Sequence, residues 1–185
     1  MIRDKEVHLP RQATHTIIAN SFLLLGTETL TLLGRKELIK WVSLVALKGL
    51  SCDEPGELIL KSLIRGRFAQ NLALSKMAKA QVSNAFLMGI FSHIDALLDR
   101  PLPEILHEIS LDEEIKQTLL GKGHNQLSTL YQLIQSYERG DWEVYSFYVD
   151  EIKSNERDIS KSYREALLWA HELVLCNDYY NNAIL

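Results

Sequence analysis

The stretch from Ala85 to Leu98, AFLMGIFSHIDALL, constrains the fold more than any other part of this 185-residue chain. On a helix, at about 100° per residue, its large apolar side chains fill one broad arc. They are Phe86, Leu87, Ile90, Phe91, Ile94, Leu97 and Leu98. Small residues form a second stripe at Ala85, Gly89, Ser92 and Ala96, which leaves a narrow polar strip at Met88, Asp95 and Asp99. We therefore predict a nearly buried central helix over about 84–98, closely approached by a neighbour along the small stripe.

Helical periodicity continues from about Ala13 to Leu175, and no alternating run indicates a sheet, so we predict an all-α, multi-helix bundle. Helices are expected to end or be separated at Gly34, Gly49, the connection 75–83 and the loop 121–124. Helices are expected to begin at Asp53 with Pro55, at Pro103 and at a capping box of Ser110 and Glu113, and Gly140 with Asp141 is expected to end one helix and cap the next. We expect the polar end, 177–185, to be irregular.

The periodicity also predicts which side chains face the core. Before Pro55 these are Leu38, Trp41, Val42, Val45 and Leu47, and after it Leu58, Ile59, Leu63, Phe68 and Leu72. The later helices contribute Leu127, Leu130, Tyr131 and Ile134, then Trp142, Tyr145, Val149 and Ile152, and finally Ile159, Tyr163, Ala166, Leu167, Ala170 and Val174.

Composition and charge exclude several classes of protein. A formal charge of −4 argues against a general nucleic-acid binder, and we assign Lys61, Arg65 and Arg67 to a solvated helix face. Two isolated cysteines do not form a disulfide framework and fit a reducing cytosol. The apolar run at 17–25 is too short to span a bilayer, so we expect a cytoplasmic chain with no membrane contact.

The residues offer little for catalysis. His93 and Asp95 are the obvious seed of a metal site, but on a helix they point about 200° apart, so a hydrogen-bonded core histidine is favoured. Ser92 diverges from His93 too far to be its nucleophile. Surface or capping roles suit the other candidates, which are His107, His124, His171 and the acidic trio Asp112, Glu113 and Glu114. No phosphate-binding glycine loop occurs.

Four segments together carry a family resemblance. They are LLGRKELIKWVSLVAL (32–47), IRGRFAQNLA (64–73), AFLMGIFSHIDALLDRPLPEIL (85–106) and IQSYERGDWE (134–143). Over about 32–175 the chain resembles the HDOD domain, most narrowly the C-terminal half of bacterial EAL–HDOD signalling proteins. The resemblance implies an all-α domain related to HD phosphohydrolases that lacks their metal-binding residues and acts in signal transduction.

The resemblance also locates a degenerate site. The adjacent His-Asp pair of an HD enzyme falls at about Ser92 and His93, and an earlier histidine falls near Gly66 or Arg67. With Asp95, these are the degenerate HD-site positions, and we expect no catalytic residue, metal or cofactor there. We divide the chain into a divergent N-terminal segment (1–33), an HDOD-like domain (34–176) and a polar tail (177–185).

We therefore expect a non-catalytic signalling domain, connected with cyclic di-GMP, that acts through protein partners, among them an EAL-type or other signalling domain. Two alternatives stay open. One is a metal-dependent phosphohydrolase or cyclic-nucleotide phosphodiesterase, in which His93, Asp95 and a third histidine converge. The other is a small-ligand sensor with an apolar pocket bordered by Arg65 or Arg67. Oligomeric state and input signal do not follow from the sequence.

Overall fold

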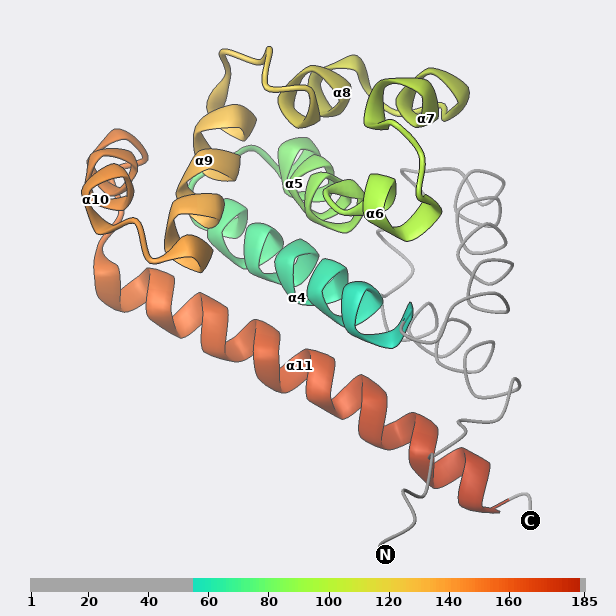
Figure 1. Ribbon diagram of the computed structural model, residues 1–185. Coiled ribbons are helices and arrows are strands. Elements are labelled where there is room, and N and C mark those ends of the chain that lie inside the picture. The colour runs from blue at the N-terminus through green and yellow to red at the C-terminus, as the bar shows by residue number, and fades with distance from the viewer. Residues whose placement is uncertain (1–54, 184–185) are drawn as a thin grey trace, which may run out of the picture.

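A computed structural model describes residues 55–183, with side chains described from Glu57 to Glu172 except Ala80. Every regular element in this range is an α-helix, which confirms the all-α prediction (Figure 1). The helices are α4 (Pro55–Leu74), α5 (Lys79–Phe91), α6 (Ile94–Leu98), α7 (Leu102–Glu108), α8 (Glu113–Leu119), α9 (Gln126–Arg139), α10 (Trp142–Glu151) and α11 (Glu156–Ala183). The predicted N-terminal segment (1–33), the helix after Gly34 and its core positions lie outside the described residues.

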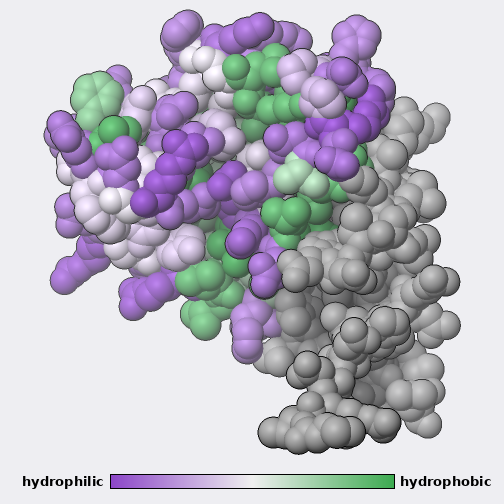
Figure 2. Space-filling model, in the orientation of Figure 1, coloured by the Kyte–Doolittle hydropathy of each residue, from purple (hydrophilic) through white to green (hydrophobic). Residues whose placement is uncertain are grey.

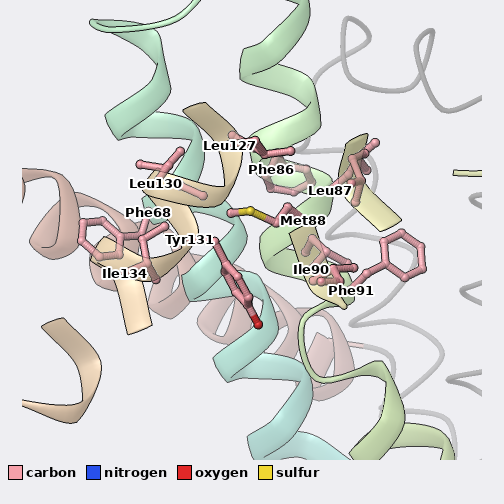
Figure 3. Close-up of a cluster of buried hydrophobic side chains, with 14 of the residues drawn as sticks. Phe68, Phe86, Leu87, Met88, Ile90, Phe91, Leu127, Leu130, Tyr131 and Ile134 are labelled. Atoms are coloured by element: carbon pink, nitrogen blue, oxygen red, sulfur yellow. The ribbon is translucent and has the colours of Figure 1, made fainter. Parts of the chain in front are cut away.

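Helix α5 lies at the centre of the bundle. It contacts α4, α8 and α9, while the long α11 packs along the other side of α4 (Figure 1). Because neighbours enclose α5 on several sides, even Met88, which the sequence assigned to a polar strip, is fully buried. Figure 3 shows it inside a cluster of side chains from α4, α5 and α9. The predicted buried helix is therefore confirmed for α5, and the polar assignment of Met88 is wrong.

Most predicted core positions are buried. In α4 these are Ile59, Leu63, Phe68 and Leu72, with Leu58 partly buried, and in α9 all four predicted residues are buried. Two predictions are wrong, because the side chain of Trp142 is 61% exposed and that of Leu167 is 38% exposed. Both lie on helices with only one side against the bundle, where a periodic pattern does not tell a buried position from one at the edge.

Some of the predicted helix boundaries are confirmed and others are wrong. Gly140 ends α9 with φ of 70°, and the Asp141 side chain accepts a hydrogen bond from the Val144 N–H to cap α10, as predicted. The loop at 121–124 is confirmed. The capping box at Ser110 is wrong, because Asp112 caps α8.

Two other connections also differ from prediction. Helix α5 begins at Lys79, inside the connection expected at 75–83. The polar end is helical as far as Ala183, so the irregular tail expected from residue 177 is wrong over the described part.

Candidate functional site

The predicted central helix bends at Ser92 and His93, which separate α5 from α6. The Ser92 N–H donates to the Gly89 carbonyl at 3.3 Å, and the Ser92 hydroxyl donates to the same oxygen at 2.6 Å. A side chain that bonds the preceding turn competes with helix continuation, so the prediction of one unbroken helix over 84–98 is wrong here. We call this pair the α5–α6 bend.

Two glycines bring α4 and α5 into close contact just before the bend. A Cβ on Gly89 lies only 2.5 Å from the Gly66 Cα and N atoms, closer than a real Cβ approaches backbone. Gly66, which the family resemblance assigned to a degenerate HD site, is therefore a packing residue covered by α5. The close approach that the small stripe predicted for Ala85 and Gly89 is confirmed, whereas Ala96 of the same stripe is exposed.

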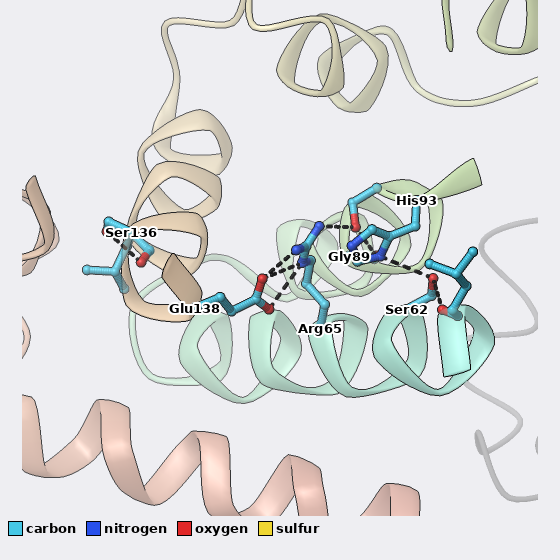
Figure 4. A network of polar contacts seen from close by, with 9 residues as sticks. Ser62, Arg65, Gly89, His93, Ser136 and Glu138 are labelled. Carbon is cyan, nitrogen blue, oxygen red and sulfur yellow. Dashed lines mark hydrogen bonds and ion pairs between the residues drawn. The ribbon is translucent and has the colours of Figure 1, made fainter. Parts of the chain in front are cut away.

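Arg65 connects three segments of the bundle (Figure 4). Its Nη1 donates to the Ser92 Oγ at 2.8 Å, and its Nε donates to both carboxylate oxygens of Glu138, at 3.0 and 3.1 Å. Its Nη2 completes the ion pair with Glu138. The two side chains are only 12% and 21% exposed. The assignment of Arg65 to a solvated face is therefore wrong, because this guanidinium ties α4 to the α5–α6 bend and to the end of α9.

His93 contacts a hydroxyl, which confirms the predicted hydrogen bond, although the side chain is only partly buried. Its Nδ1 lies 3.3 Å from the Ser62 Oγ, and that hydroxyl donates its one hydrogen to the Leu58 carbonyl at 2.8 Å. Because the serine hydrogen is engaged, the contact assigns the imidazole proton to Nδ1 and leaves Nε2 as an acceptor. Burial, reinforced by the positive charges of Arg65 and Lys61 and opposed by Asp95, lowers the pKa of His93 to about 4. The imidazole is neutral at physiological pH.

The other two degenerate positions point elsewhere. Arg67 lies over the Trp169 ring of α11, 5.3 Å from its centroid, and donates to the Gln70 Oε1 at 2.8 Å. Burial lowers the pKa of Arg67, and Glu165 opposes that effect. Asp95 is exposed on the first turn of α6. The fold thus brings together Ser92 and His93, but neither Arg67 nor Asp95 joins their hydrogen bonds.

No group of three His, Cys, Asp or Glu side chains that could hold a metal ion occurs among the described residues. His107, His124 and His171 are exposed on α7, the 121–124 loop and α11. The convergence of a third histidine on His93 and Asp95, which the phosphohydrolase alternative required, is therefore not seen in this part of the chain. Within the same range, no helix has both the length and the apolar character needed to cross a bilayer.

Sequence reasoning missed Ser62 and Glu138, which complete what we call the Arg65 network: Ser62, Arg65, Ser92, His93 and Glu138. A signal for part of it was present. Ser62, Gly66, Ala69 and Ala73 form a stripe of small, buried residues on α4, matching the small stripe on α5. Such a stripe marks a close helix contact, and Arg65 lies beside it. Nothing local singles out Glu138, which is 73 residues from Arg65.

Comparison with known proteins identifies two homologues. The chain is 33% identical over 150 residues to YuxH of Bacillus subtilis, described as an uncharacterized protein, covering 80% of this chain and 36% of YuxH. It is 31% identical over 146 residues to the cyclic di-GMP phosphodiesterase CdgJ of Vibrio cholerae, covering 79% of this chain and 34% of CdgJ. The chain thus spans about a third of the length of these relatives. No family profile and no solved structure matches it.

Proposed function

We propose that this chain is a non-catalytic signal-transduction domain of the HDOD type that acts through protein contacts. The observation that carries the proposal is its homology to a cyclic di-GMP phosphodiesterase over 79% of the chain but only 34% of that relative. A stretch of this size, shared with a longer signalling protein, fits a module that works beside a separate catalytic domain. A cytoplasmic location and an EAL-type partner belong to the same proposal.

The Arg65 network supports the non-catalytic part. A hydrolytic metal centre needs several imidazole and carboxylate ligands around an open position. In the region that the HD resemblance assigns to that centre, Gly66 packs against Gly89, and Ser92 accepts from Arg65. A guanidinium at this place repels a divalent cation, and the Glu138 carboxylate beside it is engaged in an ion pair with Arg65.

Metal-dependent phosphodiester hydrolysis is the second candidate, because CdgJ is named as a phosphodiesterase. The deciding experiment measures the metal content of protein purified without chelators, together with cyclic di-GMP hydrolysis in added Mg²⁺ or Mn²⁺. We expect no bound transition metal and no turnover above the level of a His93→Ala variant. About one metal ion per chain, with turnover that His93→Ala abolishes and the exposed-histidine control His107→Ala retains, contradicts the proposal.

The protein-contact part needs its own test. Titrating the chain into purified EAL-type phosphodiesterase domains of its host, and following cyclic di-GMP hydrolysis, measures any coupling directly. We expect one of these domains to change its rate about fivefold or more, within the usual range of allosteric coupling. Unchanged rates with every such domain contradict an EAL-type partner.

A further inference from the structure

Helix α10 presents an apolar group to solvent on its outer side. The side chains of Phe147 and Val144 are 62% and 41% exposed, and they share a face because they are three residues apart. The Phe147 ring makes an edge contact with Tyr148, 5.1 Å between centroids. Figure 2 shows a small hydrophobic area over α10, bordered by hydrophilic residues. Well-exposed aromatic side chains of this kind are enriched among the anchors of protein interfaces.

Carboxylates surround this apolar group. Glu143 lies four residues before Phe147, and Asp150 and Glu151 lie three and four residues after it, so all three share its side of the helix. All three are exposed, and none forms an ion pair with a residue that the structure describes. Helix α10 has no basic residue, and Arg139 and Lys153 lie beyond its two ends. We call Glu143, Val144, Phe147, Asp150 and Glu151 the α10 face.

We propose that the α10 face binds a basic segment of a partner protein that carries an apolar anchor. This inference rests on the protein-contact role in the proposed function. An apolar residue of the partner contacts Phe147 and Val144, while its Lys or Arg side chains lie against the three carboxylates. Complementary charge at the rim raises the association rate and selects the partner, and the aromatic centre supplies the binding energy.

The same charges disfavour two other occupants. A second copy that meets this face about a two-fold axis sets three carboxylates against three carboxylates. An anionic lipid surface is likewise repelled. A basic amphipathic segment matches the α10 face in both charge and apolar content. It would bind as an amphipathic helix that packs against α10.

The test uses the full chain and a fluorescent peptide of Lys and Leu, about 18 residues long so that it forms an amphipathic helix. Two further peptides, one with Glu in place of Lys and one without Leu, separate charge from apolar content. Fluorescence anisotropy is expected to show that only the peptide with both Lys and Leu binds, and that added salt weakens this binding. Val144→Ala with Phe147→Ala is expected to weaken it about tenfold or more, and Glu143→Lys with Glu151→Lys to abolish it.

Matched controls lie on other helices. Leu168→Ala removes a 65% exposed side chain from α11, and Glu113→Lys with Glu172→Lys makes the same charge change on α8 and α11. Both are expected to bind like the parent chain, and circular dichroism confirms that all variants are folded. Equal weakening by the controls overturns the proposal, because the peptide then senses only overall charge.

Two more results overturn it in favour of another occupant. One is a dimer in light scattering that Phe147→Ala dissociates, and the other is flotation with phosphatidylglycerol vesicles that the same change abolishes. Failure here is distinct from failure of the proposed function. Cyclic di-GMP hydrolysis rejects a non-catalytic domain whatever the peptide does, whereas unaltered peptide binding in the α10 variants, without hydrolysis, rejects only this docking face.

Discussion

The segment YERGDWE contains two glutamates, five residues apart, with opposite surroundings. Glu138 lies at the end of α9, its side chain only 21% exposed, and pairs with Arg65. Glu143 lies on the first turn of α10, exposed and without an ion pair among the described residues. The left-handed turn at Gly140 separates them. The first half of this segment therefore belongs to the bundle's internal connections and the second half to its outer surface, although each half carries a glutamate.

The same substitution at an internal and at an outer phenylalanine is expected to give the largest difference in stability. Phe68 is fully buried between α4 and its neighbours, whereas Phe147 is 62% exposed on α10. We expect Phe68→Ala to lower the free energy of unfolding by roughly 3–5 kcal/mol, and Phe147→Ala by less than about 0.5 kcal/mol. Urea unfolding measures both. A comparable loss for the two variants means that α10 is covered in solution.

The ion pair gives the next largest effect. Arg65→Met leaves the Glu138 carboxylate without its partner, and we expect a loss of roughly 2–3 kcal/mol, below the cost at a fully buried pair because 21% of Glu138 is exposed. Adding Glu138→Gln to Arg65→Met is expected to restore part of the lost stability, and a double-mutant cycle measures this recovery. Glu143→Gln is the matched change on α10 and is expected to be neutral. If the effects of Arg65→Met and Glu138→Gln on the free energy of unfolding simply add, that result contradicts a coupling between the two side chains.

The contact between Gly89 and Gly66 is expected to give an intermediate effect on stability. Gly89→Ala places a Cβ 2.5 Å from Gly66 backbone atoms, which forces α4 and α5 apart. We expect a loss of roughly 1–3 kcal/mol, and a larger loss for Gly89→Leu. Thermal unfolding measures it, with Ser146→Ala on the exposed side of α10 as the control. An unchanged melting temperature for Gly89→Ala rules out the close helix crossing.

The smallest effect is a pH dependence. His93 has its pKa lowered to about 4 in the folded chain, against 6.5 for a free imidazole. Between these values the unfolded chain binds the proton and the folded chain does not, so stability is full above pH 6.5 and falls as the pH drops toward about 4. Because half of the side chain is solvated, we expect a modest slope. Unfolding curves at several pH values should show a flatter profile for His93→Gln, and identical profiles contradict the lowered pKa of His93.

Much of the fold followed from local pattern. The apolar positions of α4 and α9, the small residues of α5, and the turn at Gly140 with its cap Asp141 are each set by residues a few positions apart. Predictions of burial were wrong where the packing of neighbouring helices determined whether a side chain is exposed. The periodicity of α5 placed Met88 in a polar strip, but Met88 is buried because α8 and α9 cover α5. The periodicity of α10 placed Trp142 in the core, but Trp142 is exposed because α10 lies at the edge of the bundle.

The candidate site was less predictable than the helices. The sequence expected a hydrogen-bonded histidine at position 93 and separated it from Asp95, and His93 does contact the Ser62 hydroxyl. The degenerate HD-site positions, which rest on a family resemblance, stay a prediction. The sequence placed Arg65 in solvent and did not find Glu138. Their bond joins residues 73 positions apart, and no helical periodicity extends over that distance.

Local sequence was enough to predict that the described chain is helical, where several helices begin or end, and that α5 is buried, because hydrophobic periodicity and capping act over a few residues. Tertiary structure alone decided that Ser92 and Arg65 meet, that Gly66 is covered by Gly89, and that Phe147 is left facing solvent among carboxylates. The physical reason is that burial and ion pairing depend on which surfaces the packed helices share, and that arrangement is set by the whole bundle.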